Sequence, residues 1–493
     1  MLFAKITFKN ALFSRLLRRF CARTLMYYLY TPALRAESSR THKKITIFKS
    51  PLNMVVKFFL PLFFIITWST VQASPKIEHW QTSKGTDVYY VYAPELPMLD
   101  LQVVFDAGSS RDGDKPGLSM LTNGLLAQGA DGLDADAISK GFESLGAVYG
   151  SDTGYDSSSV QLRSLTEKDL LDKALLNLKK VLSKPDFPKD ALERRRSRTL
   201  IGIQSKQESP GALAQDAFMK ALYKSHPYAQ PSEGTEESVK SITREDITAF
   251  YKKYYVASNA MVAMVGAIDR KQAETIAEDL IGSLEQGKKA APLESVKDLD
   301  KADTIFIEHP SVQTHILVGQ PGVKRGDPDY FPLYVGNQIL GGGSMVSRLF
   351  EEIREKRGLS YSAYSYFSPM RFEGPFIAGL QTKTDQVDEA LSLLMENIKK
   401  FIENGPTEEE LIAAKKNITG GYALRIDSNS KILGYVVVIA YYGLPLDYLD
   451  TFNAKVEAVT VDQIKDAFKR RLHPDKMITV KVGSSAKDQK EGS

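Results

Sequence analysis

Alternating hydrophobic and polar residues predict two strands near the start of each half of the chain. Residues 87–92 and 101–106 carry this alternation in the first half, and residues 303–308 and 314–319 carry it in the second. Such alternation is typical of strands, because successive side chains point to opposite faces of a sheet. Longer segments with helical periodicity follow each pair, and an apolar strand closes each half. We therefore expect helices packed on a sheet in both halves.

Two blocks of the sequence recur about 220 residues apart. Residues 166–204 and 386–424 each contain an amphipathic helix ending in Leu/Ile-Lys-Lys, a break with proline, and a second long helix. Residues 241–266 and 458–483 each predict a Thr-capped helix, a short turn and an apolar strand closing on Val-Gly. A shared offset indicates two copies of one fold. The prediction is an α+β fold of two homologous domains, each with helices on a largely antiparallel sheet.

The length of 493 residues also favours at least two domains. We place the first domain at residues 74–281 and the second at residues 304–485. The segment between them, residues 282–303, is polar with few large apolar residues and is predicted to be a linker. Residues 486–493 form a polar tail.

The first 73 residues have the composition of a leader. Residues 54–73 contain an apolar run from Phe58 to Trp68 and end in Val-Gln-Ala, which predicts a signal peptide too short to span a membrane. The preceding segment, residues 1–53, is basic and by itself resembles a mitochondrial presequence. We favour translation from Met54 and a secreted or periplasmic mature chain from about Ser74, with a mitochondrial location as the alternative. No later stretch is long enough for a stable membrane span.

Charge and cysteine content change once the leader is set aside. Of 64 Lys and Arg residues 12 lie in residues 1–73, with one of 60 Asp and Glu residues, so the remainder carries 52 basic and 59 acidic residues, a net charge of −7. We expect no nucleic-acid partner, because no basic stripe remains. The single cysteine, Cys21, also lies in the leader, and a cysteine-free mature chain is compatible with an oxidising compartment.

Two quoted segments resemble a known family. The block "NQILGGGSMVSRLFEEIREKRGLSYSAYSYF", residues 337–367, is similar to the second-domain signature of the M16 metallopeptidases, which include pitrilysin-like enzymes, mitochondrial processing peptidase and bacterial relatives. Residues 225–269 resemble the end of that family's first domain. The resemblance runs from about residue 80 to residue 484. It implies that each chain consists of two homologous domains and forms one half of a clamshell.

The resemblance implies a zinc site that this chain lacks. Active members carry His-x-x-Glu-His on a helix, where the two His ligate Zn²⁺ and the Glu acts as base on the bound water. The segment "GLSMLTNGLLAQGA", residues 117–130, predicts that helix, but Met120 and Gly124 stand at the ligand positions and Asn123 at the base position. A thioether is a weak zinc ligand, glycine offers none, and an amide cannot accept a proton. The buried stripe of this helix is predicted to be Leu118, Leu121 and Leu125.

The remaining ligand position is also altered. The family's further Glu would fall at Ile201 or Gly202, where no carboxylate stands. The six histidines form no His-Glu-x-x-His or inverted pair, and His226 is interpreted as a structural loop residue. We therefore predict no metal and no cofactor in this chain.

The second domain keeps its signature. Gly341, Gly342 and Gly343 precede a predicted helix, and the resemblance implies that they form a mobile loop lining the substrate chamber. Arg354 and Tyr361 lie seven residues apart, and chain reversal at a glycine between them can bring both side chains to one side. In active members this pair faces the zinc and supports the oxyanion of the tetrahedral intermediate. We expect the helix to bury Val346, Leu349, Phe350 and Ile353, to stop at Gly358, and to be followed by a strand from Leu359.

The loss of one half of the site and retention of the other predicts a division of labour. The chain is interpreted as the non-catalytic subunit of a secreted heterodimeric M16 peptidase, which supplies Arg354 and Tyr361 to the zinc site of a partner with His-x-x-Glu-His. The substrate would be a peptide. One alternative is a peptide-binding or scaffold protein, as are the core subunits of respiratory complex III, and another is a mitochondrial regulatory subunit. Whether the partner is a different gene product or a second copy stays open.

Overall fold

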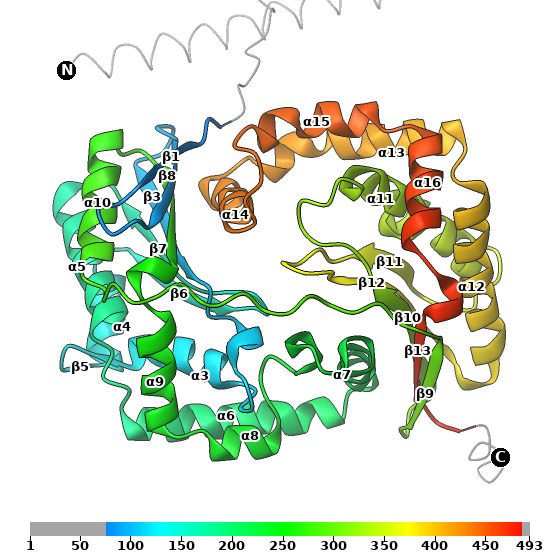
Figure 1. Ribbon diagram of the computed structural model, residues 1–493, viewed down its shortest axis with the longest axis horizontal. Coiled ribbons are helices and arrows are strands. Elements are labelled where there is room, and N and C mark those ends of the chain that lie inside the picture. Colours follow the sequence, from blue (N-terminus) through cyan, green and yellow to red (C-terminus); the bar gives the residue numbers. More distant parts are fainter. Residues whose placement is uncertain (1–74, 486–493) are drawn as a thin grey trace, which may run out of the picture. The chain divides into compact units, whose positions relative to one another are not determined.

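The computed structural model describes residues 75–485 (Figure 1). The predicted leader and the polar tail from residue 486 lie outside the described residues. No helix in the described part of the chain is long and apolar enough to cross a membrane.

The first half is built on a six-stranded sheet in the order β1-β2-β8-β3-β7-β6. Its strands are β1 (Glu78–Gln81), β2 (Asp87–Tyr92), β3 (Met98–Phe105), β6 (Val148–Thr153), β7 (Ser158–Leu165) and β8 (Ala260–Gly266). Only β2 and β8 pair in parallel, and the other neighbours are antiparallel. The small hairpin of β4 (Gly129–Ala130) and β5 (Leu133–Asp134) stands apart from this sheet.

The second half repeats this topology. Its five strands, in the order β11-β12-β10-β13-β9, are β9 (Asp303–Glu308), β10 (Gln313–Pro321), β11 (Ala363–Phe367), β12 (Pro375–Lys383) and β13 (Ile478–Gly483). Again one pair, β9 with β13, is parallel and the rest are antiparallel. Matching β2, β8, β3, β7 and β6 with β9, β13, β10, β12 and β11 preserves every pairing direction. The expected α+β fold of two homologous halves is confirmed.

Helices cover the sheets in both halves. In the first half they are α3 (Leu118–Leu125), α4 (Ala135–Glu143), α5 (Lys168–Ser183), α6 (Lys189–Gln207), α7 (Pro210–Tyr223), α8 (Glu236–Ser241), α9 (Arg244–Tyr254) and α10 (Arg270–Gly282). In the second half they are α11 (Tyr330–Asn337), α12 (Val387–Asn404), α13 (Glu408–Gly420), α14 (Asn429–Tyr441), α15 (Tyr448–Ala458) and α16 (Val461–Arg471).

The repeated Thr-capped helices are α9 and α16. Thr243 accepts a hydrogen bond from the Asp246 backbone N–H, and Thr460 accepts one from the Gln463 N–H. In both cases the N3 side chain bonds back to the cap residue, so two free N–H groups at the helix start are satisfied. The predicted helix, turn and strand follow in both copies.

Each half lends one helix to the sheet of the other. Helix α14 packs on β8 and β3, and its residues Val436 and Ile439 share a hydrophobic cluster with Val265. Helix α7 packs on β13 and β10, where Phe218 shares a cluster with Val480. Figure 1 shows α14 in orange beside the first sheet and α7 in green beside the second. The domain boundaries proposed from sequence stay a prediction, but the packing of either half is incomplete without the other.

The segment between α10 and β9 has neither helix nor strand. It is nevertheless held along its length: Leu299 is buried in the cluster around α7, and the Glu294 carbonyl contacts the His226 ring. The predicted linker is therefore an extended strap packed against the protein.

Candidate functional site

Helix α3 is the helix expected to carry the metal site. Its buried face is the predicted stripe, since Leu118, Leu121 and Leu125 are 8%, 0% and 0% exposed. The helix begins beside buried Asp112, whose carboxylate accepts hydrogen bonds from the backbone N–H groups of Gly117 (2.7 Å) and Ser119 (2.8 Å). Burial raises the pKa of Asp112 to about 7, although these hydrogen bonds lower it.

Asn123, at the position where the resemblance places the catalytic base, is buried and hydrogen-bonded through both of its amide atoms. Its amide Nδ2 donates to the carbonyls of Asp152 (2.8 Å) and Ser159 (3.2 Å), and its Oδ1 accepts from the Tyr255 hydroxyl (3.1 Å). These bonds tie α3 to β6, β7 and the segment after α9. The side chain therefore has a structural role and points no free group at a substrate.

Gly124, at the second ligand position, makes room for an arginine from α6. A Cβ added there would lie 2.1 Å from Cζ of Arg195, so the guanidinium packs directly over the glycine. Burial lowers the pKa of Arg195, and repulsion from nearby Arg198 lowers it further. A positively charged side chain thus stands where a metal ligand would be.

The other two sequence-predicted positions meet in one cavity. Met120 and Gly202 line a space of about 390 Å³ between α3 and α6, together with Arg195 and Arg198. Ile201 is 66% exposed and does not line this cavity. In residues 75–485 no group of three His, Cys, Asp or Glu could hold a metal ion. The donor set of a thioether, an engaged amide and two guanidinium groups does not fit Zn²⁺.

The three glycines of the second half do not form an open loop. Gly341 and Gly342 belong to π-helical turns at Gln338–Gly342 that extend α11, which corrects the expectation of a loop at these residues. Gly341 is buried, and a Cβ there would lie 2.4 Å from the Ser365 backbone nitrogen on β11. A close approach of backbone to backbone explains this glycine. Only Gly343 lies between the helical turns and a 3₁₀ turn at Ser344–Val346.

Arg354 and Tyr361 are brought together. Arg354 donates from Nη1 to the Tyr361 backbone carbonyl (3.0 Å), and its guanidinium carbon lies 4.4 Å from the centroid of the Tyr361 ring. It also lies 4.8 Å from the Phe350 ring. Tyr361 is 73% exposed and the Arg354 side chain is 33% exposed. The structure describes a stacked cation and phenol that face outward.

The backbone between them turns at Gly358, as predicted. Gly358 has φ +64°, and its N–H donates to the Arg354 carbonyl while the Leu359 N–H donates to Ile353. Left-handed glycine is the common way to end a helix. The strand that follows is β11, which begins at Ala363 rather than at Leu359.

The predicted buried stripe of this helix is wrong at one position. Leu349, Phe350 and Ile353 are buried, but Val346 is 79% exposed. Val346 belongs to the separate 3₁₀ turn, and the chain is extended at Ser347 before the π-helical turns at Phe350–Glu355 begin. The helical period therefore does not continue back to Val346.

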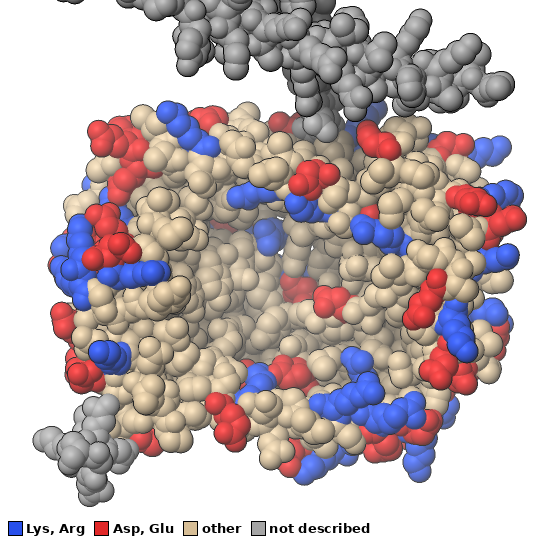
Figure 2. Space-filling model, turned by 180° about the vertical axis from the view of Figure 1, so that it is seen from behind, with Lys and Arg blue, Asp and Glu red and all other residues tan. Residues whose placement is uncertain are grey.

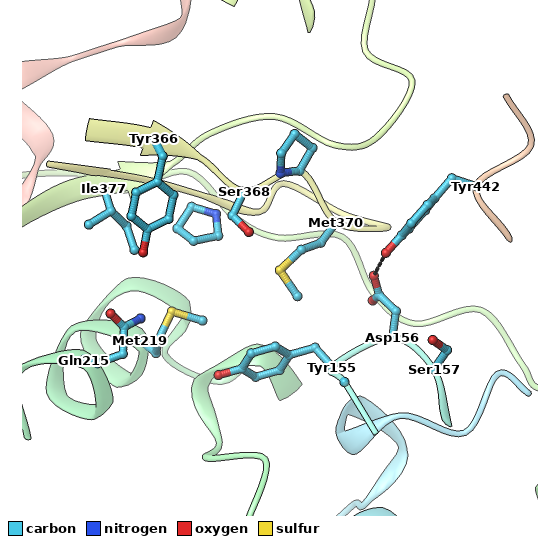
Figure 3. A pocket seen from close by; sticks show the side chains of 13 residues that line it. Tyr155, Asp156, Ser157, Gln215, Met219, Tyr366, Ser368, Met370, Ile377 and Tyr442 are labelled. Carbon is cyan, nitrogen blue, oxygen red and sulfur yellow. Dashed lines mark hydrogen bonds between the residues drawn. The ribbon is translucent and has the colours of Figure 1, made fainter. Parts of the chain in front are cut away.

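A second cavity, of about 330 Å³, has walls from both halves (Figure 3). Tyr155 and Met219 come from the first half, while Tyr366 and Met370 come from the second. At its edge the Asp156 carboxylate accepts hydrogen bonds from the hydroxyls of Tyr442 (2.9 Å) and Tyr228 and from the Arg371 backbone N–H (2.9 Å). Apolar and hydrogen-bonding groups are thus mixed along one wall. A mixed lining of this kind is typical of ligand-binding cavities.

A buried ion-pair network lies beside this cavity. Asp106 accepts hydrogen bonds from Arg111 (2.8 and 2.9 Å) and from Arg371, whose guanidinium stacks over the Tyr441 ring at 4.7 Å. Arg371 and Tyr441 come from the second half, so the network joins the halves. Figure 2 shows this molecule from behind, hollowed in the middle, with charged side chains of both signs around and within the hollow.

Sequence reasoning found His226 but missed other groups. His226 Nδ1 accepts from the Tyr228 N–H (3.2 Å), which agrees with a structural role, and burial lowers its pKa. Arg195 and Arg198 went unnoticed, although the run "RRRSR" on a helix beside the altered metal site was a usable signal. Asp156 could not be found, because its partners lie 72 to 286 residues away.

Both halves of the chain match models of one protein family. Residues 88–236 match the insulinase (peptidase family M16) domain, and residues 241–418 match the peptidase M16 inactive domain. A Helicobacter pylori protein known as non-peptidase homolog YmxG is 28% identical over 439 residues, covering 88% of this chain and all of that relative.

Solved structures resemble the whole described part. A crystal structure of a peptidase M16 inactive domain from Pseudomonas fluorescens is 40% identical, with a TM-score of 0.81, and the match covers 83% of this chain and 98% of that one. A protease from Helicobacter pylori shares the fold with a TM-score of 0.76 at 19% identity, covering 83% and 99%. The chain belongs to the M16 peptidase family, and among its relatives is one named as a non-peptidase.

Proposed function

We propose that this protein is the non-catalytic subunit of a heterodimeric M16 peptidase. Its partner would carry His-x-x-Glu-His and the zinc ion, and this chain would supply Arg354 and Tyr361. The Arg354 guanidinium and the Tyr361 phenol would donate hydrogen bonds to the negative charge that develops on the substrate carbonyl oxygen. Preorganised donors of this kind are among the largest contributions to acyl-transfer catalysis.

The observation that carries the proposal is the arrangement of Arg354 and Tyr361. A Tyr that is 73% exposed next to a charged residue is not needed for the core of this chain. Stacking at 4.4 Å fixes the guanidinium relative to the phenol, so the two donors would approach a partner as one rigid unit. In the first half, by contrast, the side chain of Asn123, at the expected base position, is hydrogen-bonded within the chain, and Arg195 covers Gly124.

The location follows from the leader. We propose a secreted or periplasmic protein beginning at about Ser74, whose partner is exported with it. Sequencing the N-terminus of the native protein tests this part, and an N-terminus at Met1 contradicts it.

The catalytic proposal is tested with the native complex. The protein is captured from its host, an M16 partner with the zinc motif is identified, and peptide hydrolysis is measured with Arg354→Ala and Tyr361→Phe variants. Loss of one oxyanion donor lowers kcat on the order of 10² to 10³-fold, with a modest change in KM. The variants should still fold and assemble, because neither residue lies in the core.

Glu351→Ala is the matched control, since this exposed residue lies on the same helical segment and should change turnover little. Peptidase activity within about twofold of wild type in both variants, far from the expected loss, would show that the pair is structural.

A peptide-binding protein without any peptidase role is the second candidate. The mixed lining of the cavity between the halves favours it independently of Arg354. This second function is supported if capture of the native protein finds no partner with a zinc motif and peptides bind the isolated chain.

A further inference from the structure

The cavity beside α3 and α6 has an unusual charge arrangement. Its lining includes three cationic side chains, Arg195, Arg198 and Lys206, and one carboxylate, Glu233. Lys206 is already neutralised, because its ammonium group pairs with both Asp216 (2.8 Å) and Glu233. Lys206, Asp216 and Glu233 together carry one net negative charge, and the two arginines, which pair with neither carboxylate, bring the cluster to a net charge of +1.

Both arginines lack an ion-pair partner in the described part of the chain, where Arg195 interacts electrostatically with Arg198 and with the Tyr149 phenol. Within residues 75–485, no carboxylate or hydrogen-bond acceptor contacts the guanidinium of Arg195 or of Arg198. Arg195 is half-buried, and its pKa is lowered by burial and by the charge of Arg198. Repulsion from the neighbouring exposed Arg198 is unfavourable for a half-buried guanidinium without an ion-pair partner. An anion entering the cavity would relieve that repulsion.

The position of Arg195 is built into the backbone. Its guanidinium packs over Gly124, where any Cβ would come within 2.1 to 2.4 Å of three guanidinium atoms. Glycine in a helix is less stable than alanine, because it loses more backbone conformational freedom. Because Gly124 has no Cβ, the planar Arg195 guanidinium can lie against the helix at the wall of the cavity.

The cavity selects the class of anion. A space of about 390 Å³ exceeds what a small inorganic ion needs, and Met120 and Ile203 add apolar surface beside the arginines. Guanidinium groups match the two oxygens of a carboxylate in a planar, bidentate way. A residue with a terminal carboxylate and an ordinary side chain satisfies both parts of the lining.

We propose that Arg195 and Arg198 bind the C-terminal carboxylate of a peptide at the place where active relatives hold zinc. The identity of the ligand as a peptide rests on the proposed function, whereas the anion site itself rests on this chain alone. The positive charge of the two guanidinium groups then stands where active relatives hold the zinc ion. The first half would use this charge to bind the end of a peptide rather than to cleave it.

Two synthetic peptides of one sequence test the proposal on the purified chain, one with a free C-terminal carboxylate and one with a C-terminal amide. Fluorescence anisotropy at fixed ionic strength should give at least about tenfold tighter binding of the free acid, as charge-assisted hydrogen bonds imply. Arg195→Gln and Arg198→Gln should abolish that preference. Arg198 is exposed, so its variant folds even if replacement of Arg195 disturbs packing.

Arg194→Gln is the matched control, because Arg194 lies on the same helix and pairs with Asp190 at the surface. Equal binding of both peptides, binding of neither, or an equal loss in the Arg194 variant overturns the site. Two further probes identify the source of the anion: inorganic phosphate, and an amidated peptide with an internal Asp. If either binds as tightly as the free acid, recognition of a peptide terminus is wrong. Failure of the proposed function would appear separately, in the partner's peptidase activity.

Discussion

The two halves of the molecule share a strand order but differ in the partners of the aspartate at the start of the helix that follows the central strand. In the first half, α3 begins beside buried Asp112, whose carboxylate accepts hydrogen bonds from the backbone N–H groups of Gly117 and Ser119. In the second half, α11 begins beside Asp329, which pairs with Arg470 (2.7 Å) and Arg471 (2.7 Å). The pKa of Asp112 is raised by burial, whereas hydrogen bonds from the two arginines lower the pKa of Asp329.

The same contrast holds at the tyrosine that follows a helix-ending glycine. Gly146 and Gly358 both have positive φ, and a tyrosine stands three residues later in each half. Tyr149 stacks on Phe142 at 5.4 Å and has a buried hydroxyl, whereas Tyr361 stacks on Arg354 and faces outward. One backbone arrangement thus supports an inward residue in the first half and an exposed one in the second. The tyrosine of the first half therefore packs within the chain, whereas that of the second half is available at the surface.

The largest expected effect comes from returning a carboxylate to the base position. Asn123→Asp places a negative oxygen against the carbonyls of Asp152 and Ser159, which now accept from the amide. An uncompensated buried charge costs about 3 to 5 kcal/mol. Urea unfolding should show a loss of this size.

Met120→Leu is the control for Asn123→Asp, since a volume-conserving change on the same helix should cost less than about 1.5 kcal/mol. An Asn123→Asp variant that is as stable as this control would mean that the three hydrogen bonds do not hold α3.

The stability of the first half should fall as pH rises. The pKa of Asp112 in the folded protein is about 7, above its ordinary value of 3.8, so the folded state binds the proton more tightly than the unfolded state does. This contribution is fully present below about pH 4 and is lost as pH rises through 7. At about 1.4 kcal/mol per pKa unit it amounts to roughly 4 kcal/mol at most. Chemical denaturation from pH 4 to 8 should show the decline, and Asp112→Asn should flatten it.

Asp329 should act with the opposite sign. Its pKa is lowered, so its contribution is present above its ordinary value of 3.8 and disappears only as pH falls through the folded pKa below that value. Asp329→Asn should cost about 1 to 3 kcal/mol at pH 7, as loss of hydrogen bonds between charged groups does. Equal pH profiles for the Asp112 and Asp329 variants would remove the contrast between the halves.

Much of the fold could be predicted because its signals are local. Strands β2 and β9 have the predicted bounds, and the caps at Thr243 and Thr460 were readable from three-residue spacings. The exposure of Val346 was not predictable from helical period alone, because the turn after the glycines resets that period. The packing of α7 and α14 on the sheet of the opposite half was not predicted from the sequence. An amphipathic helix does not specify which sheet covers its apolar face.

The site divides in the same way. Met120, Asn123 and Gly124 were singled out because the family motif fixes their spacing, and Arg354 and Tyr361 because the family signature places the two residues seven apart; their functional roles stay predictions. The network of Asn123 with Tyr255 spans 132 residues and required the structure. The contact of Arg195 with Gly124 likewise depends on how α6 crosses α3.

The smallest expected effect on stability belongs to Gly124→Ala. A Cβ at this position must displace the Arg195 guanidinium, but a flexible side chain can move at little cost, and alanine improves helix propensity by about 1 kcal/mol. The unfolding free energy should therefore stay within about 1 kcal/mol of wild type.

The preference for a peptide with a free C-terminal carboxylate should nevertheless fall, because the guanidinium no longer lies against α3. Gly282→Ala is a matched control: this glycine lies on α10 and does not line the cavity, a Cβ there has no atom within 4 Å, and binding should not change. In the double variant with Arg195→Gln, Gly124→Ala should add no further loss, since both changes act on one group. Undiminished preference in Gly124→Ala would mean that Gly124 does not position Arg195, and the glycine would then mark only a lost ligand.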